Sequence, residues 1–188
     1  MIRVKETSRT FIKADENFKR EDLARLAAKG KLERIEHGIY RNPNAEISEY
    51  ESLIVASLIV PKGVICLLSA LRFHDLTTQN PFEIWMAVKP HAHRPQTRQI
   101  SLRIVHFSGK SLTEGIEEHE IGGEMIRVYN SAKTIADCFK FRHKTGLDTA
   151  LEALKEARRK KLFTIDDLWY YAGICRVKNV IRPYLEAL

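Results

Sequence analysis

The chain is poor in cysteine, and its cysteines are far apart. Only Cys66, Cys138 and Cys175 occur in the 188 residues. An odd number at such spacing fits neither a disulfide framework nor a Cys-x-x-Cys metal knuckle. Each lies among apolar neighbours, so we predict buried free thiols in a reducing compartment.

Long apolar runs are also missing. The longest, Leu53 to Val60, contains Ser57 and stops at Pro61, far short of the ~20 residues that a membrane span needs. The first six residues include Arg, Lys and Glu rather than the apolar core of a secretion signal. We therefore expect no membrane contact and a cytoplasmic location.

Charge is plentiful but unevenly distributed. Hydrophobic residues make up 44% of the chain, enough for a folded core, and the formal charge of +7 favours polyanionic partners such as nucleic acid. Residues 89–110 contain no acid, whereas residues 111–124 contain no Lys or Arg. The distribution of charge is therefore more informative than its total.

The N-terminal pattern predicts a short helix followed by a hairpin. Residues 19–29 are rich in helix formers, and Gly30 is a natural stop. Residues 31–36 alternate polar and apolar as a strand does, and a turn at His37-Gly38 would return the chain along Ile39-Tyr40. Asn42-Pro43-Asn44 breaks the pattern. We predict two domains, residues 1–43 and 44–188.

The remainder predicts strands followed by helices, so the expected fold class is α+β. We expect a helix capped by Ser48, an apolar segment over 64–76 that becomes helical, strands over 82–88 and 102–107, and a hairpin turning at Gly122-Gly123. Later helices should be capped by Ser131 and Thr164 and include one around 147–154.

The helix and hairpin carry many bases, which suits duplex DNA because its backbone is a dense line of negative charge. The candidate contacts from this pattern are Lys19, Arg20, Arg25, Lys29, Lys31, Arg34 and Arg41. The alternative interpretation is a solvated helix face with ordinary i,i+4 charge pairs. A secondary basic patch of Lys89, Arg94, Arg98 and Arg103 could contact phosphate or be a solvated loop.

An enzyme is the competing hypothesis. Glu83 and Lys89, with Asp75 before them, loosely resemble a metal-dependent nuclease arrangement, in which carboxylates hold an ion and a lysine orients water. Such spacing is common by chance, and His91-x-His93 lacks a nearby ligand partner. We predict no catalytic residue, no metal, no cofactor and no small-molecule substrate.

Three long stretches resemble the AbiEi antitoxins of bacterial type IV toxin–antitoxin systems. They are GKLERIEHGIYRNP (30–43), VICLLSALRFHDLTTQNPFEIWMAV (64–88) and the stretch from Arg103 to Leu154, which contains VYNSAKTIADCFKFR. The resemblance implies an N-terminal winged helix, an α/β C-terminal antitoxin domain, and repression of the protein's own operon through operator DNA. It also implies neutralisation of a nucleotidyltransferase-like toxin without a stable toxin complex.

The resemblance also assigns roles to positions. The recognition helix maps to Lys19–Lys29 and the wing to Lys31–Arg41, with Gly38 and Tyr40 matching an Arg-Gly-x-Tyr pattern. His37 stands where that pattern commonly has Arg, and joins the candidate DNA contacts. Only ten residues precede Phe11, where the family usually has a full helix, so either the natural start lies further upstream or the helix–turn–helix is incomplete. A non-DNA-binding interaction module with a degenerate winged helix is therefore a further alternative.

Overall fold

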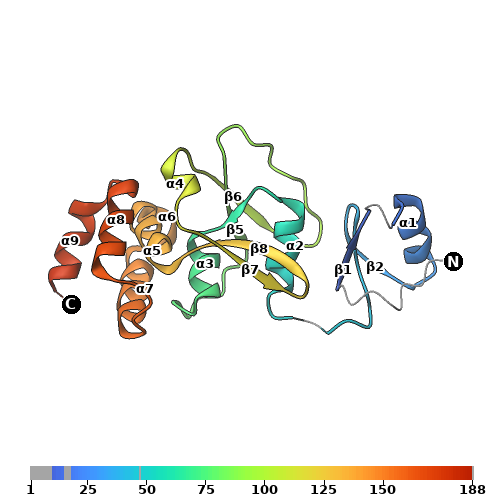
Figure 1. Ribbon diagram of the computed structural model, residues 1–188, viewed down its shortest axis with the longest axis horizontal. Coiled ribbons are helices and arrows are strands. Elements are labelled where there is room, and N and C mark those ends of the chain that lie inside the picture. Colours follow the sequence, from blue (N-terminus) through green and yellow to red (C-terminus); the bar gives the residue numbers. More distant parts are fainter. Residues whose placement is uncertain (1–9, 15–17, 47, 188) are drawn as a thin grey trace.

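The computed structural model describes residues 10–14, 18–46 and 48–187. It is an α+β fold with two separate sheets, as the sequence predicts (Figure 1). The expectation about the first helix falls on residues that lie outside this description. None of the described helices has the length and apolar character needed to cross a membrane.

The N-terminal unit is one helix packed on a small antiparallel sheet. Its elements are β1 (Phe11–Lys13), α1 (Arg20–Ala28), β2 (Glu33–Glu36) and β3 (Ile39–Arg41). The sheet order is β1-β3-β2, so β3 lies in the centre. The helix and hairpin are confirmed, whereas β1 is a strand that the sequence analysis did not predict.

The second unit begins with a five-stranded mixed sheet in the order β6-β5-β4-β8-β7. Adjacent pairs β5–β6 and β4–β8 are parallel, and the other two pairs are antiparallel. Its elements are α2 (Glu51–Ile59), β4 (Val64–Ile65), α3 (Leu67–Phe73), β5 (Ile84–Val88), β6 (Leu102–His106), α4 (Lys110–Thr113), β7 (Ile116–Ile121) and β8 (Glu124–Tyr129).

The last part of the chain is helical and lies at the end of the molecule opposite the N-terminal unit (Figure 1). It comprises α5 (Ser131–Lys140), α6 (Arg142–Thr145), α7 (Leu147–Arg159), α8 (Ile165–Cys175) and α9 (Lys178–Glu186). Helix α5 is buried along its length except at its last residue, because α3, α7 and α8 all pack against it.

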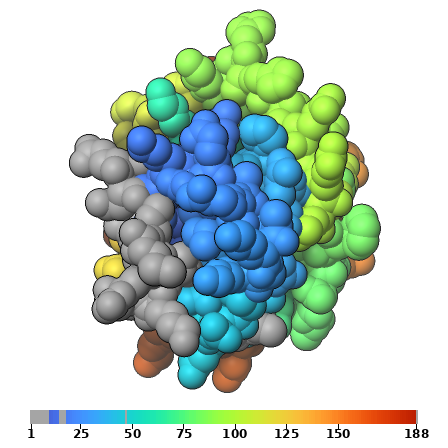
Figure 2. Space-filling model, turned by 90° about the vertical axis from the view of Figure 1, so that its right-hand side faces the viewer, coloured from blue at the N-terminus to red at the C-terminus, as the bar shows by residue number. Residues whose placement is uncertain are grey.

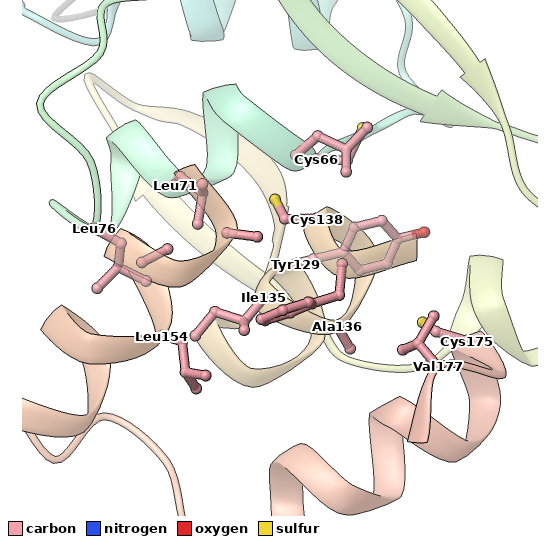
Figure 3. Packing of buried hydrophobic residues seen from close by; sticks show 14 of the residues in the cluster. Cys66, Leu71, Leu76, Tyr129, Ile135, Ala136, Cys138, Leu154, Cys175 and Val177 are labelled. Atoms are coloured by element: carbon pink, nitrogen blue, oxygen red, sulfur yellow. The ribbon is translucent and has the colours of Figure 1, made fainter. Parts of the chain in front are cut away.

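The second sheet is covered on both faces, which explains why all five residues of β5 are buried. Ile84 and Met86 pack with α2, whereas Trp85 and Ala87 belong to the larger core around α5. Figure 3 shows the centre of that larger core, where side chains from α3, β8, α5 and α8 meet. The three cysteines are buried free thiols in this core, as expected from their neighbours.

The N-terminal unit is packed against the rest of the chain. Phe11, Ile35 and Ile39 join the core formed by α2 and the second sheet. The side-chain amine of Lys13 donates to the backbone carbonyl of Leu58 in α2. The expected boundary after residue 43 is not tested by these contacts and stays a prediction.

Two of the three predicted helix caps are wrong. Helix α2 begins after Tyr50, and the Ser48 hydroxyl instead accepts the Tyr50 N–H at 3.2 Å. Ser131 lies inside α5, since Asn130 takes the cap position and its side chain accepts the Lys133 N–H at 2.8 Å. The Thr164 cap is confirmed, and it includes a reciprocal bond from Asp167.

Candidate nucleic-acid interface

Helix α1 has one buried and one exposed face. Leu23 is fully buried and Leu26 and Ala27 are partly buried, and they pack on apolar residues of the small sheet and its flanks. This spacing places Arg25 on the opposite, exposed side, whereas Arg20 is exposed at the first position of the helix, beside the buried stripe. The predicted cations Lys19 and Lys29 are also exposed, at the two ends of the helix.

The exposed face of α1 carries two short side chains. Ala24 and Ala28 lie on it beside Arg20, so a partner can approach the helix backbone closely between longer basic side chains. Two acids offset part of the positive charge: Glu21 shares this face, and Asp22 forms an ion pair with Arg25. The face can therefore accept an anionic groove, but its net charge is modest.

The hairpin beside α1 presents further cations. Gly38 adopts a φ of +75° at the turn, a conformation that side chains rarely allow and that makes the tight β2–β3 connection possible. Lys31, Arg34 and His37 are exposed along this hairpin and the approach to it. Figure 2 shows the N-terminal unit at the centre of this face of the molecule, with the segment that follows β5 beside it.

Arg41 differs from the other predicted contacts because its charge is already engaged. Its guanidinium lies 2.6 Å from the Glu33 carboxylate and 3.2 Å from that of Glu51, and its side chain is only 18% exposed. The hydrogen bond that Arg41 donates to Glu33, assisted by the charges of both carboxylates, raises the pKa of Arg41. This residue ties β3 to α2, so we leave it out of the proposed DNA contacts.

The four cations of the secondary basic patch have different surroundings in the structure. Arg103 lies over the Trp85 ring at 4.2 Å and pairs with Glu83 at 3.3 Å, whereas Arg94 donates to the Leu102 carbonyl at 3.2 Å. Lys89 is exposed after β5. The fourth member, Arg98, lies next to the hairpin of the N-terminal unit.

The nuclease alternative depends mainly on Glu83, and this carboxylate pairs with an arginine in the structure. The Glu83 carboxylate is 3.3 Å from the Arg103 guanidinium, so it is already engaged in an ion pair. In the described part of the chain, no group of three or more His, Cys, Asp or Glu side chains is placed to hold a metal ion.

Sequence reasoning missed Glu36 as a structural residue. Strand alternation suggests that Ile35 points inward and Glu36 outward, yet both are buried because the pairing of β2 with β3 shifts between Arg34 and Glu36. The Glu36 carboxylate accepts the backbone N–H groups of Arg98 and Gln99, each at 2.7 Å. No local signal marks a contact between residues more than 60 positions apart.

The exposed basic helix and hairpin lie inside a segment that is similar to a known protein family. Residues 8–43 match the family described as transcriptional regulator, AbiEi antitoxin. The similarity to the AbiEi antitoxins is therefore a property of this N-terminal segment. The resemblance expected from the sequence is confirmed here, over a segment that runs from β1 through β3.

The match to the AbiEi family does not extend to α2 or beyond. No curated protein matches the chain. The AbiEi family is one of transcriptional regulators and antitoxins, which agrees with the predicted class of protein. The individual DNA contacts, the operator and the toxin remain predictions.

Proposed function

We propose that this protein is the antitoxin of a type IV toxin–antitoxin system and that it binds operator DNA to repress its own operon. The observation that carries this proposal is the exposed basic face of α1 beside a basic hairpin, within the segment that matches the AbiEi family. A helix of this size fits the major groove of duplex DNA, and an adjacent hairpin reaches the flanking backbone.

The proposed contacts are the exposed cations that no carboxylate holds tightly. Arg25 is included because its side chain is 66% exposed, and ion pairs of exposed side chains are weak and easily exchanged for phosphate. The contact set is Lys19, Arg20, Arg25, Lys29, Lys31, Arg34 and His37. Each Lys or Arg that neutralises a phosphate releases condensed counterions, so binding should weaken steeply with salt.

The repressor half is tested by fluorescence anisotropy with duplex from the region upstream of the gene and with scrambled duplex of the same composition, over a salt series. We expect at least ~10³-fold preference for the upstream duplex, as specific regulators typically show. Arg20→Gln with Lys29→Gln should weaken binding to both duplexes and reduce the salt slope by about 0.9 for each lost phosphate contact. Equal, weak binding to both duplexes would instead support a degenerate winged helix.

The antitoxin half concerns a nucleotidyltransferase-like toxin, which we propose is neutralised without a stable complex. The test is co-expression of the chain with the product of the adjacent gene, which this proposal expects to be nucleotidyltransferase-like. Growth should be rescued while the two proteins elute separately in gel filtration. Failure to rescue growth contradicts the antitoxin half, and co-elution contradicts only the absence of a complex. We propose no catalytic activity, in keeping with a family of transcriptional regulators.

A further inference from the structure

A cleft of about 480 Å³ lies between the N-terminal hairpin and the loop that joins β5 to β6. One wall is formed by residues 34–37 around the end of β2, and the other by residues 96–99 of the loop. The cleft therefore combines residues of the family-matched segment with residues far along the chain. Figure 2 shows the two segments side by side on this face.

The walls of the cleft are held together by Glu36. Its carboxylate accepts two successive backbone N–H groups of the loop, and its side chain is only 7% exposed. Across the same junction, the Gln99 side-chain amide donates to the Arg34 carbonyl at 3.3 Å. Charge-assisted hydrogen bonds of this kind are stronger than neutral ones, so the loop has a defined position relative to the hairpin.

The lining of the cleft is basic and rich in hydrogen-bond donors. It contains two arginines, Arg34 and Arg98, together with His37, and both arginines are exposed. Among the residues that the structure describes, neither guanidinium takes part in an ion pair. Gln96, Thr97 and Gln99 add neutral donors.

Glu36 is the one acid among the residues that line the cleft, and its buried carboxylate is occupied by the two N–H groups. Two guanidinium charges against one carboxylate leave the cleft positive without any contribution from His37. Arginine forks bind phosphate oxygens through two parallel hydrogen bonds, and neutral amide and hydroxyl donors commonly complete such sites.

We propose that this cleft binds a phosphoryl group, held between Arg34 and Arg98. The DNA backbone beside α1 is one source of that group, and a free phosphorylated ligand is the other. With DNA as the source, the proposal rests on the proposed function and extends it: the second unit contributes Arg98 to the DNA interface, and Glu36 positions that contribution. The affinity of this protein for DNA would then depend on residues outside the family-matched segment.

The DNA arm of the test compares wild type, Arg98→Gln and Arg158→Gln in salt-dependent anisotropy with the upstream duplex. Arg158→Gln is the matched control, since it removes the same charge from an exposed position in α7, at the opposite end of the molecule (Figure 1). We expect Arg98→Gln to weaken binding about 5–10-fold near 0.1 M salt and to reduce the salt slope by about 0.9. The control should retain the wild-type slope.

The second arm uses inorganic pyrophosphate, without DNA, in a thermal-shift titration of the same three proteins. A rise in Tm for wild type and Arg158→Gln, but not for Arg98→Gln, supports the cleft with a free phosphorylated ligand as the source. Circular dichroism spectra and the Tm without ligand show whether Arg98→Gln is folded. An Arg98→Lys variant, which keeps the charge but loses the fork, should recover only part of either effect.

The outcomes separate this proposal from the proposed function. If wild type prefers the upstream duplex and Arg98→Gln behaves like wild type in both arms, the cleft proposal is overturned while the repressor function stands. If wild type shows no preference for the upstream duplex, the repressor function fails, and the pyrophosphate arm still decides the cleft. A wild-type response to pyrophosphate that Arg98→Gln retains also counts against the cleft.

Discussion

Lys133 and Asp137 form an ion pair one turn apart on α5, and neither side chain is exposed to solvent. The amine of Lys133 also lies 4.1 Å from the centre of the Tyr129 ring, and the thiol of Cys175 donates to Asp137 at 3.1 Å. Burial raises the pKa of Asp137, and the charge of Lys133 opposes that rise. The pair thus joins α5, α8 and β8 at the centre of the second unit.

Removing one member of this pair should destabilise the protein strongly. Lys133→Met leaves a buried carboxylate without its cation, for which we expect a loss of about 3–5 kcal/mol in the free energy of unfolding. Urea denaturation measures this loss. Lys140→Met, at the exposed end of the same helix, is the control and should change stability by less than ~0.5 kcal/mol.

The double variant Lys133→Met with Asp137→Leu tests the reason for that loss. Two apolar side chains of similar size need no desolvation of charge, so most of the stability should return. A double variant as unstable as Lys133→Met would mean that packing, rather than the unpaired carboxylate, causes the loss.

Gly115 and Gly123 offer a matched pair of alanine substitutions. Both have φ of +79°, so each alanine should cost about 1–2 kcal/mol from the left-handed backbone alone. A Cβ on Gly123 meets no atom within 4 Å, whereas one on Gly115 would lie 2.9 Å from Lys133 Cβ and 3.0 Å from Tyr171 Cε1. Overpacking should therefore make Gly115→Ala about 1–3 kcal/mol worse than Gly123→Ala in urea unfolding. Equal losses would show that the surrounding core yields without cost.

His74 should make stability depend on pH. Burial is the main cause that lowers its pKa below the ordinary 6.5, and its Nε2 donates to the Tyr129 carbonyl at 2.8 Å. A lowered pKa in the folded state means that the unfolded chain takes up the proton first. The His74 contribution is therefore complete above pH 6.5 and is lost as pH falls through the lowered pKa.

The measurement is the free energy of unfolding of wild type and His74→Gln between pH 8 and pH 5. The wild type should lose stability on acidification more steeply than the variant, because only the wild type has the His74 imidazole with its lowered pKa. Charged and titratable neighbours, Glu117, His119 and Asp75, are unchanged in this comparison. Parallel pH profiles would show that His74 has no such role.

Arg34 and Arg41 should respond in opposite ways to the same substitution. Arg41→Gln loses the contacts with Glu33 and Glu51, so we expect a fall of about 1–2 kcal/mol in unfolding free energy and an unchanged salt slope of DNA binding. Arg34→Gln, on the neighbouring strand, should change stability by less than ~0.5 kcal/mol and reduce the salt slope by about 0.9. Anisotropy and urea unfolding of both variants decide between a contact with DNA and a contact within the fold.

Local sequence patterns determined much of this fold. The helix formers between Lys19 and Lys29, the turns at Gly38 and at Gly122-Gly123, and the Thr164 cap all depend on residues a few positions apart. Such features can be predicted because backbone preference and short-range hydrogen bonding act within one turn of helix or hairpin. The cations of the helix and hairpin were also visible in the sequence, although residues 1–50 hold 9 Asp and Glu against 11 Lys and Arg.

Only the tertiary structure decided which of these charges are available. Arg41 and Arg34 look alike in the sequence, yet one is held by two carboxylates and the other is exposed beside a cleft. Glu36 points inward because of a shift in strand pairing, and its partners lie in a loop far along the chain. Such contacts depend on how whole elements pack, and periodicity within a short segment carries no information about distant partners.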